Sequence, residues 1–486
     1  MPVTRLRSRL KHEKKAAISC STAPGILLDR VGIMILAARP MKTFFRLAIL
    51  VSTGLFASTM TIFGQGSLTP PAAPAPTMKT LDQIEARTPI SSLPFTISSP
   101  GSYYLTKSLN VTTGNGITIN AAQVTVDLNG FTISSNASSA NGTGIALASG
   151  LADITIFNGH IKGGVAYLSG TYSGPGFANG IEYSGNAPVN VRVTGISVLG
   201  CLSDGINLSA NAFALVESCI VQTVGGNGIV AANVSHSVAN LCGNVGIFAP
   251  TVSDCYAQST GSSDAISATN AHNCEAQNTG SGIGLYAYTA SNCYGSSVSG
   301  LGLSATTATN CQGVSSGGGD GLDASEANNC YGVSNTGDGL DANQATNCYG
   351  YNTGSSGNGS VGLRADNAIN CYGFTASGAY GLYAYTAAGC FGKAAGSGGS
   401  GLARIGLAAY VTANNCWGDG PDEGLSAPTA TNCYGSCSAH LCTGVYATVA
   451  IGCVGLTSDG VGLQSYIANS CIGNGTQQIT YKYNMP

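Results

Sequence analysis

The chain has 486 residues, of which 69 are Gly and 18 are Cys, and only 8% are Asp, Glu, Lys or Arg. This low charge content excludes a coiled coil and a charged disordered tail. Residues 1–40 hold eight of the Lys and Arg residues, so the remaining 446 residues carry 11 basic and 20 acidic side chains and would repel a nucleic-acid backbone. The apolar residues are mostly small, which favours a stack of short repeats over one globular core.

Residues 41–64 have the features of a secretory signal peptide, with Lys42 and Arg46 in a basic start that is followed by an apolar run. A transmembrane anchor is the alternative, but the uninterrupted apolar run is shorter than the ~20 residues needed to cross a bilayer. We therefore expect export. Residues 1–40 are then an extension that is either dispensable or not translated, with a start at Met41 or Met34.

Residues 65–78 form a Pro-rich spacer of extended character. Thr80 and Gln83 have the spacing of a helix N-cap, which predicts a short helix that closes the N-terminal end of the repeat region. The repeats fill residues 79–475. The segment 476–486 departs from the repeat and is the expected C-terminal cap.

The central part of the chain repeats with a period close to nineteen residues. From Cys255 onward, units such as NCYGVSNTGDGLDANQAT recur, and six successive Cys residues are 19, 19, 18, 19 and 18 residues apart. Within a unit, small apolar residues alternate with polar ones in two short runs that are broken by Gly-containing turns, which is strand periodicity. This pattern predicts an all-β, single-stranded parallel β-solenoid of about 17 stacked coils.

Three segments resemble the opening coils of secreted bacterial right-handed parallel β-helix repeat proteins, the pectin-lyase-like superfamily. They are PFTISSPGSYYLTKSL at 94–109, GITINAAQVTVDLNGFTIS at 116–134 and ITIFNGHIKG at 154–163. The resemblance implies the right-handed coil, which the period alone leaves open. It is less informative about activity, because the superfamily holds polysaccharide lyases, glycoside hydrolases and adhesins.

Signatures of the superfamily's polygalacturonases are missing from this chain. There is no Asp-Asp pair, His160 lies in a Gly-His-Ile context, and Arg404-Ile405 is followed by Gly406. The Lys and Arg residues that a pectate lyase needs as a base and for uronate carboxylates are scattered over many coils. We therefore expect a neutral glycan as partner rather than an anionic one.

The recurring Cys residues are expected to be buried thiols, because Cys packs as a small hydrophobic residue. Their even step of 18 or 19 residues does not provide the closely spaced thiolates of a zinc site. Cys433, Cys437 and Cys442 fall within one coil. Of these we expect only Cys433 to point inward, which leaves Cys437 and Cys442 free to form a disulfide.

Strand alternation places an aromatic residue on the outside next to most of these Cys residues. The residues are Tyr256, Tyr294, Tyr331, Tyr349, Tyr372, Phe391, Trp417 and Tyr434. Such a stripe can stabilise the sheet through contacts between rings on neighbouring strands. It can also bind sugar rings, whose faces are apolar and neutral. Tyr286 and Tyr383, on a second outward face, join it as candidate glycan-binding residues.

Four acidic residues form a second candidate site: Asp323 and Asp341 follow Gly-Leu in adjacent coils, and Asp320 and Asp338 precede it. Two carboxylates one coil apart would stand ~5 Å from each other, as in retaining glycosidases, so Asp323 and Asp341 are the candidate catalytic pair. The four carboxylates could instead hold Ca²⁺. They could also belong to a solvated polar patch, because Asp-Gly is ordinary turn chemistry.

Together these observations favour an exported, non-catalytic β-helix of a cell surface or matrix that binds neutral polysaccharide. The alternative is a polysaccharide-active enzyme, a glycoside hydrolase more than a lyase. No motif for a cofactor other than Ca²⁺ is present, and neither nucleic acid nor a membrane is an expected partner of the exported chain.

Overall fold

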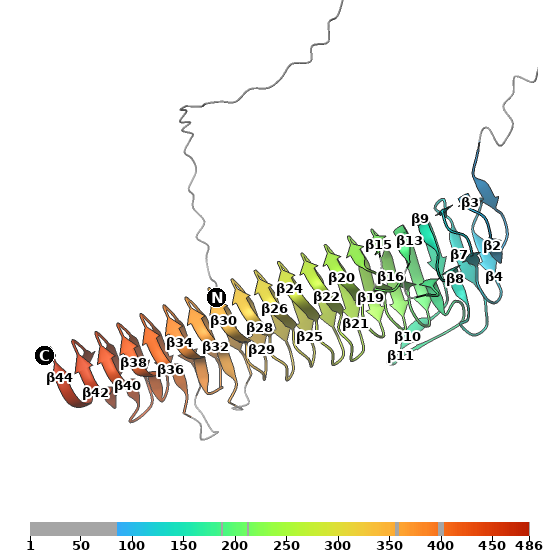
Figure 1. The fold of residues 1–486 in the computed structure, drawn as a ribbon. Coiled ribbons are helices and arrows are strands. Elements are labelled where there is room, and N and C mark those ends of the chain that lie inside the picture. Colours follow the sequence, from blue (N-terminus) through green and yellow to red (C-terminus); the bar gives the residue numbers. More distant parts are fainter. Residues whose placement is uncertain (1–84, 186–187, 211–212, 355–358, 397–402, 486) are drawn as a thin grey trace, which may run out of the picture. The chain divides into compact units, whose positions relative to one another are not determined.

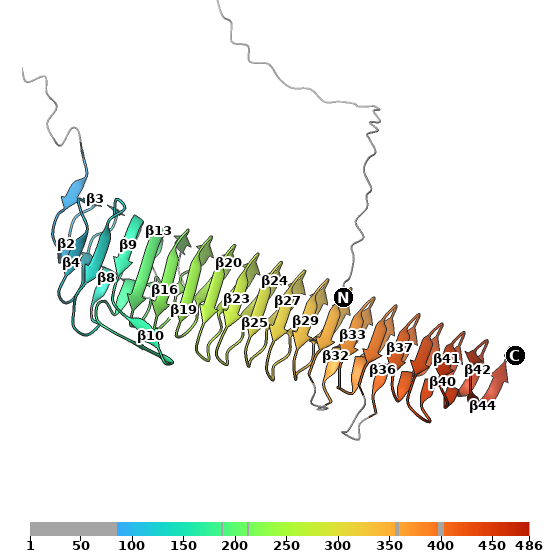
Figure 2. The ribbon, with the colours of Figure 1, turned by 180° about the vertical axis from the view of Figure 1, so that it is seen from behind.

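The computed structural model describes residues 85–485 apart from 186–187, 211–212, 355–358 and 397–402. These residues form a right-handed parallel β-solenoid of about 20 turns and contain no helix. Figures 1 and 2 show the turns stacked along one axis. In this described part, no helix is long and apolar enough to cross a membrane.

The predicted fold class is confirmed, with a few more turns than the sequence suggested. The extra turns come from segments without the Gly-Leu signal, which nevertheless pair as rungs at both ends of the stack. The segment predicted to be a C-terminal cap contributes one of these rungs. The predicted signal peptide, the spacer and the helix at Thr80 lie outside the described residues.

The first turns have three rows of parallel strands. The first row consists of β2 (Phe95–Ile97), β5 (Ile117–Ile119), β8 (Thr143–Leu147), β12 (Asn179–Tyr183), β14 (Ile206–Asn207) and β17 (Ile229–Val230). The second row has β1 (Thr88–Ile90), β3 (Gly101–Leu105), β6 (Val124–Asp127), β15 (Phe213–Glu217) and β18 (Asn233–Ser235). The third row has β4 (Leu109–Val111), β7 (Thr132–Ser135), β16 (Ile220–Val224) and β19 (Val238–Cys242). The strands β9 (Ala152–Lys162) and β13 (Val189–Cys201) run through the second and third rows. The strands β10 (Ala166–Leu168) and β11 (Thr171–Ser173) form an antiparallel hairpin.

From β20 onward the first two rows merge, so that each turn has one long strand and one short strand. The long strands are β20 (Ile247–Ser253), β22 (Ile266–His272), β24 (Leu285–Ser291), β26 (Leu303–Thr309), β28 (Leu322–Asn328), β30 (Leu340–Thr346), β32 (Val361–Ile369), β34 (Tyr380–Ala388), β36 (Ile405–Asn414), β38 (Glu423–Thr431), β40 (Thr443–Ile451), β42 (Val461–Asn469) and the last rung, β44 (Thr476–Tyr483). The short strands are β21 (Tyr256–Ser259), β23 (Glu275–Asn278), β25 (Tyr294–Ser297), β27 (Gln312–Ser315), β29 (Tyr331–Ser334), β31 (Tyr349–Asn352), β33 (Tyr372–Thr375), β35 (Phe391–Ala394), β37 (Trp417–Gly420), β39 (Tyr434–Cys437), β41 (Val454–Thr457) and β43 (Ile472–Gly473).

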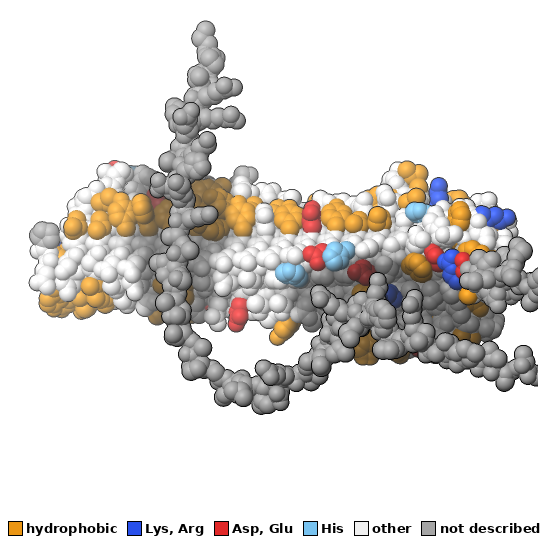
Figure 3. All heavy atoms as spheres, turned by 90° about the horizontal axis from the view of Figure 1, so that it is seen from above, with side chains coloured by type: hydrophobic (Ala, Val, Ile, Leu, Met, Phe, Trp, Pro, Cys, Tyr) orange, Lys and Arg blue, Asp and Glu red, His pale blue; other side chains and the backbone are white. Residues whose placement is uncertain are grey.

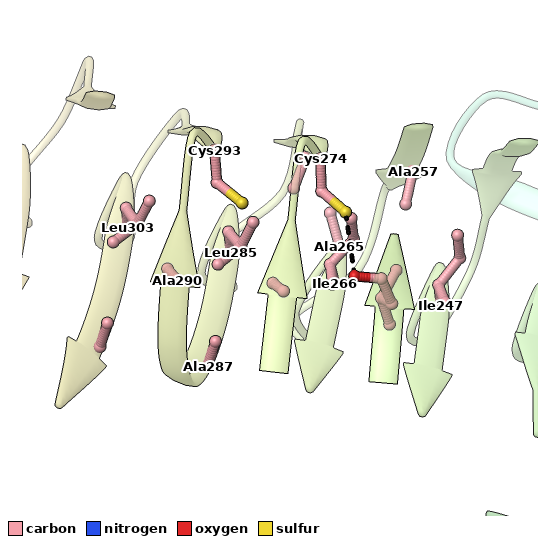
Figure 4. Close-up of a cluster of buried hydrophobic side chains, with 14 of the residues drawn as sticks. Ile247, Ala257, Ala265, Ile266, Cys274, Leu285, Ala287, Ala290, Cys293 and Leu303 are labelled. Carbon is pink, nitrogen blue, oxygen red and sulfur yellow. Dashed lines mark hydrogen bonds between the residues drawn. The ribbon is translucent and has the colours of Figure 1, made fainter. Parts of the chain in front are cut away.

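Each regular turn buries one Leu, two Ala and one Cys. In the turn that begins with β28 these are Leu322, Ala324, Ala327 and Cys330, all at most 5% exposed. Figure 4 shows the equivalent Leu, Ala and Cys side chains of other turns directed into the same core. Because identical positions pair from rung to rung, each residue type forms a buried column along the axis.

Glycine allows two backbone segments to approach each other closely: the short strand and the corner that precedes the long strand. A Cβ atom on Gly332 would overlap the carbonyl oxygen of Gly339. Gly350 meets Gly362 in the same way one turn later. Only glycine tolerates this approach of two backbones, which explains the Gly that follows Cys and an aromatic residue in the repeat.

One residue with a left-handed backbone conformation turns the chain from each long strand into the next short strand. Asn329 and Asn347 have φ of 52° and 53° at this corner, where Gly389 takes their place in a later turn. Asn adopts this conformation more readily than most residues. Its side chain also links the turns, since Asn329 Nδ2 donates to Asn310 Oδ1 at 3.3 Å.

The column of Cys residues is buried, as the alternation predicted. All 15 free cysteines in the described residues are buried. The Cys330 Sγ lies 3.3 Å from the carbonyl oxygens of both Ala308 and Asn328, to which the thiol donates. Burial raises the pKa of the Cys219 and Cys255 thiols to about 11. The reactive thiolate of these two residues is therefore scarce at neutral pH.

We expect these thiols to resist labelling in the folded protein and to react together when it unfolds. Replacing Cys330 with Ser should lower the free energy of unfolding by roughly 1–3 kcal/mol, because a hydroxyl is more costly to bury than a thiol. Cys330→Ala should cost less than that. Urea titration of the variants and labelling with a thiol reagent at pH 8 measure both effects. Rapid labelling of most thiols in the native protein would contradict the prediction.

Candidate functional site

The aromatic stripe is the first candidate surface. Its members are Tyr331, Tyr349, Tyr372, Phe391, Trp417 and Tyr434, which begin six consecutive short strands and pair in parallel register. From Tyr349 to Tyr434, the ring centroids of neighbouring members are 4.8–5.9 Å apart. Figure 3 shows hydrophobic side chains in rows along the axis of the solenoid.

Two rings that the sequence analysis did not single out extend the stripe sideways. Tyr351 and Phe374 lie two residues after a stripe member on β31 and β33, and their ring centroids are 5.1 Å apart. Tyr351 also contacts Tyr331 and Tyr372, with centroids 6.0 and 5.7 Å apart. The signal was present in the sequence, because a Tyr-Gly-aromatic triplet directs both rings outward from one strand.

Two predicted members of the stripe are separated from the rest. Tyr256 pairs with Glu275, which pairs with Tyr294, and Tyr294 pairs with Gln312 before Tyr331 is reached. A polar residue therefore lies on the rung between Tyr294 and the continuous stripe. The continuous stripe therefore begins at Tyr331, the first aromatic residue after Gln312 in this row.

The stripe rings are both packing partners and exposed surface. Tyr349 and Trp417 are 53% and 50% exposed, whereas Tyr372, Phe391 and Tyr434 are half-buried between their neighbours. Burial, with a contribution from Tyr351, raises the pKa of Tyr372 to about 12. The half-buried rings therefore stabilise the sheet, while Tyr349 and Trp417 offer open apolar area to a ligand.

The second candidate surface is the long-strand face. Each turn contributes two residues to this face. One directly follows the inward Leu or Ile, and the other lies three positions before the first, at the corner. The side chains of the two lie on the same side of the turn. Asn179 Nδ2 donates to Glu182 Oε2 at 2.7 Å across this interval, and Asn207 Nδ2 donates to Asp204 Oδ2 at 2.7 Å. Each turn thus presents a pair of outward side chains here.

Asp320 and Asp338, at the corner, hold the backbone of the next turn. Asp320 Oδ1 accepts from the N–H of Asp338 at 2.7 Å, and Asp338 Oδ1 accepts from the N–H of Val361 at 2.7 Å. Asp338 Oδ2 accepts from Arg364 Nε at 2.6 Å. These two carboxylates therefore satisfy corner N–H groups that would otherwise lack a partner.

Asp323 and Asp341 pair in register on adjacent rungs and are followed on the same row by Arg364. Burial and the charge of Asp338 raise the pKa of Asp341 to about 6, although Arg364 Nε lies 3.8 Å from Asp341 Oδ2 and acts in the opposite direction. Burial also raises the pKa of Asp323. The structure thus brings the predicted pair together one rung apart.

The side chain of Arg364 lies next to the four carboxylates that were predicted as Ca²⁺ ligands. The Arg364 guanidinium contacts Asp338 and Asp341 and neutralises part of their charge. In the described residues, no group of three or more His, Cys, Asp or Glu side chains is arranged to hold a metal ion. In addition, one oxygen of Asp320 and one of Asp338 already accept hydrogen bonds from backbone N–H groups.

Tyr286 and Tyr383 lie on the long-strand face, on either side of the acidic residues. Tyr286 pairs with Ser304, which pairs with Asp323. Tyr383 lies next to Arg364, whose guanidinium carbon is 5.7 Å from the centroid of its ring. These two tyrosines therefore belong to a surface separate from the stripe, as expected.

Cys437 and Cys442 form the predicted disulfide, and Cys433 is a buried free thiol. The expectation that only Cys433 points inward is wrong, because Cys437 and Cys442 are also buried, at 7% and 3% exposed. The disulfide joins the end of β39 to the loop before β40. At the equivalent buried position in other turns a hydroxyl binds the backbone, as Ser334 Oγ does by donating to the carbonyl of Gly319 at 2.7 Å. The disulfide replaces that polar anchor in one turn.

Comparisons with known proteins found no matching family model and no similar curated protein. Among solved structures, the chain is similar to the Dettilon tailspike protein (gp208), with 15% identity, a TM-score of 0.27, and coverage of 57% of this chain and 58% of that one. It is also similar to the catalytic domain of a GH87 alpha-1,3-glucanase in complex with nigerose, with 12% identity, a TM-score of 0.17, and coverage of 70% and 59%. The chain thus spans less than two thirds of either neighbour.

The raised pKa of Asp341 predicts a pH-dependent contribution to stability. A carboxyl group whose pKa rises from 3.8 to about 6 on folding opposes the folded state once it ionises. Its contribution is therefore greatest below pH 4 and is lost as the pH rises to about 6. The free energy of unfolding of Asp341→Asn should fall less over this interval than that of the parent. Urea titrations at pH 4, 5, 6 and 7 test this, and parallel curves for the two proteins would refute it.

Proposed function

We propose that the protein is exported and binds a neutral polysaccharide laid along the solenoid axis on the aromatic stripe, as a non-catalytic component of a cell surface or matrix. The main support for this proposal is the unbroken run of ring contacts from Tyr349 to Tyr434. Parallel strands repeat every ~4.8 Å along the axis, a step similar to the rise of one sugar in an extended glycan. Successive sugars could therefore meet successive rings.

Charge on the solenoid supports a neutral ligand. Arg364 and Arg404 form ion pairs with Asp338 and Asp422, with N···O distances of 2.6 and 2.9 Å. Lys393, beside the stripe, forms an ion pair of 3.0 Å with Asp419. Cations already engaged in this way are poorly available to the carboxylates of an anionic glycan.

Export rests on the order of basic and apolar residues in 41–64, which lies outside the described part of the chain. The mature protein is then expected to begin near Gln65. N-terminal sequencing of the protein recovered outside the cytoplasm measures this directly, and finding residues 1–40 on it would refute export through this segment.

The stripe predicts that binding depends on its exposed rings. Replacing Tyr349 and Trp417 together with Ala should weaken retention on an insoluble neutral polysaccharide by roughly 30-fold, since each ring contact is worth about 1 kcal/mol. Retention by the parent should change little between low and high salt. The fold should still melt cooperatively, because neither ring lies in the core.

Tyr288→Ala is the matched control, because Tyr288 is 62% exposed but lies on β24, outside the stripe. It should bind as the parent does. The proposal fails if the Tyr349 and Trp417 variant is retained as well as the parent, or if the parent is retained on none of a panel of neutral polysaccharides.

Glycoside hydrolysis is a second candidate function, which the adjacent Asp323 and Asp341 favour. A pKa of about 6 suits Asp341 to the role of general acid near neutral pH, next to a second carboxylate. If this function is correct, the parent releases reducing sugars from a neutral glycan and Asp341→Asn loses that activity. The absence of reducing sugar from a broad panel of glycans would exclude it and leave the binding function.

A further inference from the structure

A hollow of about 500 Å³ interrupts the long-strand face between Tyr383 and Tyr446. Four residues share one register position on consecutive rungs here, in the order Tyr383, Ala408, Ser426 and Tyr446. The two middle residues are small and the two outer ones are large. The surface is therefore recessed over two rungs and walled by a tyrosine ring at each end.

A β-bulge supplies a third wall. β36 has one more residue between its inward Leu and the following Cys than its neighbours, and its register shifts against both β34 and β38. Tyr410 lies at this irregularity, lines the hollow and is 63% exposed. Its ring centroid is 5.0 Å from that of Tyr385, which braces it on one side. Bulges commonly redirect a side chain next to a functional site.

An acidic residue with a buried carboxyl oxygen lies at the edge of the hollow. Glu423 pairs in register with Ile405, which lines the hollow, and lies three residues before Ser426, the same interval at which Asn179 contacts Glu182. Glu423 Oε2 is buried and has no hydrogen-bond partner among the described residues. Arg404 Nη2 lies 2.9 Å from Oδ1 of the adjacent Asp422. This guanidinium is therefore paired with Asp422 rather than with Glu423.

The Glu423 carboxyl group therefore acts on the hollow through Ser426. Burial, together with the charge of Asp422, raises the pKa of Glu423. A carboxyl group at this position is placed to orient the hydroxyl of Ser426, which lines the recess. Glu423 is thus a positioning residue, whereas Ser426 and the tyrosines would touch a ligand.

We propose that this hollow is a second carbohydrate-binding site, separate from the stripe, in which a neutral sugar ring lies over Ala408 and Ser426 between Tyr383 and Tyr446. Six of its lining residues carry a hydroxyl group: Tyr380, Tyr383, Tyr410, Ser426, Tyr446 and Thr448. A lipid tail would leave these hydroxyls without partners. Among the described residues, no Lys, Arg or His lines the hollow, so this part of the chain does not supply the cation that a phosphate or uronate would require.

The test uses the full chain and soluble neutral oligosaccharides of two to six sugars, with affinity measured by calorimetry. Ser426→Tyr should fill the hollow and weaken binding by at least about tenfold, without loss of the fold, because Tyr383 and Tyr446 already occupy this register position. The matched control is Ser304→Tyr, at the same register position between Tyr286 and Asp323. It should bind as the parent does.

Variants of Glu423 test its positioning role. Glu423→Gln can hydrogen-bond to Ser426 and should keep the affinity within about threefold, whereas Glu423→Leu should weaken binding by about tenfold without lowering the urea midpoint. A merely structural role would instead lower the midpoint and leave the affinity of the folded protein unchanged.

Two results would overturn the proposal: binding by Ser426→Tyr as tight as that of the parent, or the absence of any oligosaccharide binding by the parent. The outcome is independent of the stripe, because the Tyr349 and Trp417 variant should lose retention on the insoluble polymer yet keep the affinity for soluble oligosaccharides. Conversely, Ser426→Tyr should still be retained on the polymer.

Discussion

The parallel register between successive turns is the constraint on which the rest of this structure depends. Each rung hydrogen-bonds to the next with the same residue positions opposite each other, so that Leu322 pairs with Leu340 and Asp323 with Asp341. A residue type that suits the core in one turn must therefore suit it in every turn. This explains why the interior of the regular turns is built from columns of Leu, Ala and Cys.

The same register converts outward residues into rows, and the chemistry of a row depends on its neighbours. Six aromatic residues in sequence make a continuous stripe, whereas Gln312 and Glu275 interrupt the same row farther toward the N-terminus. On the long-strand face, two small residues between tyrosines make a hollow. In this fold, the order of side chains along a row therefore determines whether the row forms a stripe or a hollow.

The acidic residues show how one residue type takes two roles three positions apart. Asp320 and Asp338 accept hydrogen bonds from backbone N–H groups at the corner, while no backbone N–H of the described residues donates to Asp323 or Asp341 on the strand. The corner pair therefore holds the backbone of the next turn, whereas the strand pair lies on the long-strand face next to Arg364. Arg364, one rung farther on, moderates the charge of both sets.

The sequence by itself determined the period, the strand character, the inward Cys column and the outward aromatic residues, because alternation along a strand is a local property of the chain. It also indicated the pairing of Cys437 with Cys442 by their position in one turn. It did not reveal that Asn329 and its equivalents link the corners, since a left-handed residue is one of several ways to turn a chain. Only the tertiary structure decided that Arg364 lies against Asp338, that Tyr351 joins the stripe, and that Glu423 lies beside a hollow. These features depend on side chains from different turns, whose directions are set by bulges and corners that the repeat pattern does not encode.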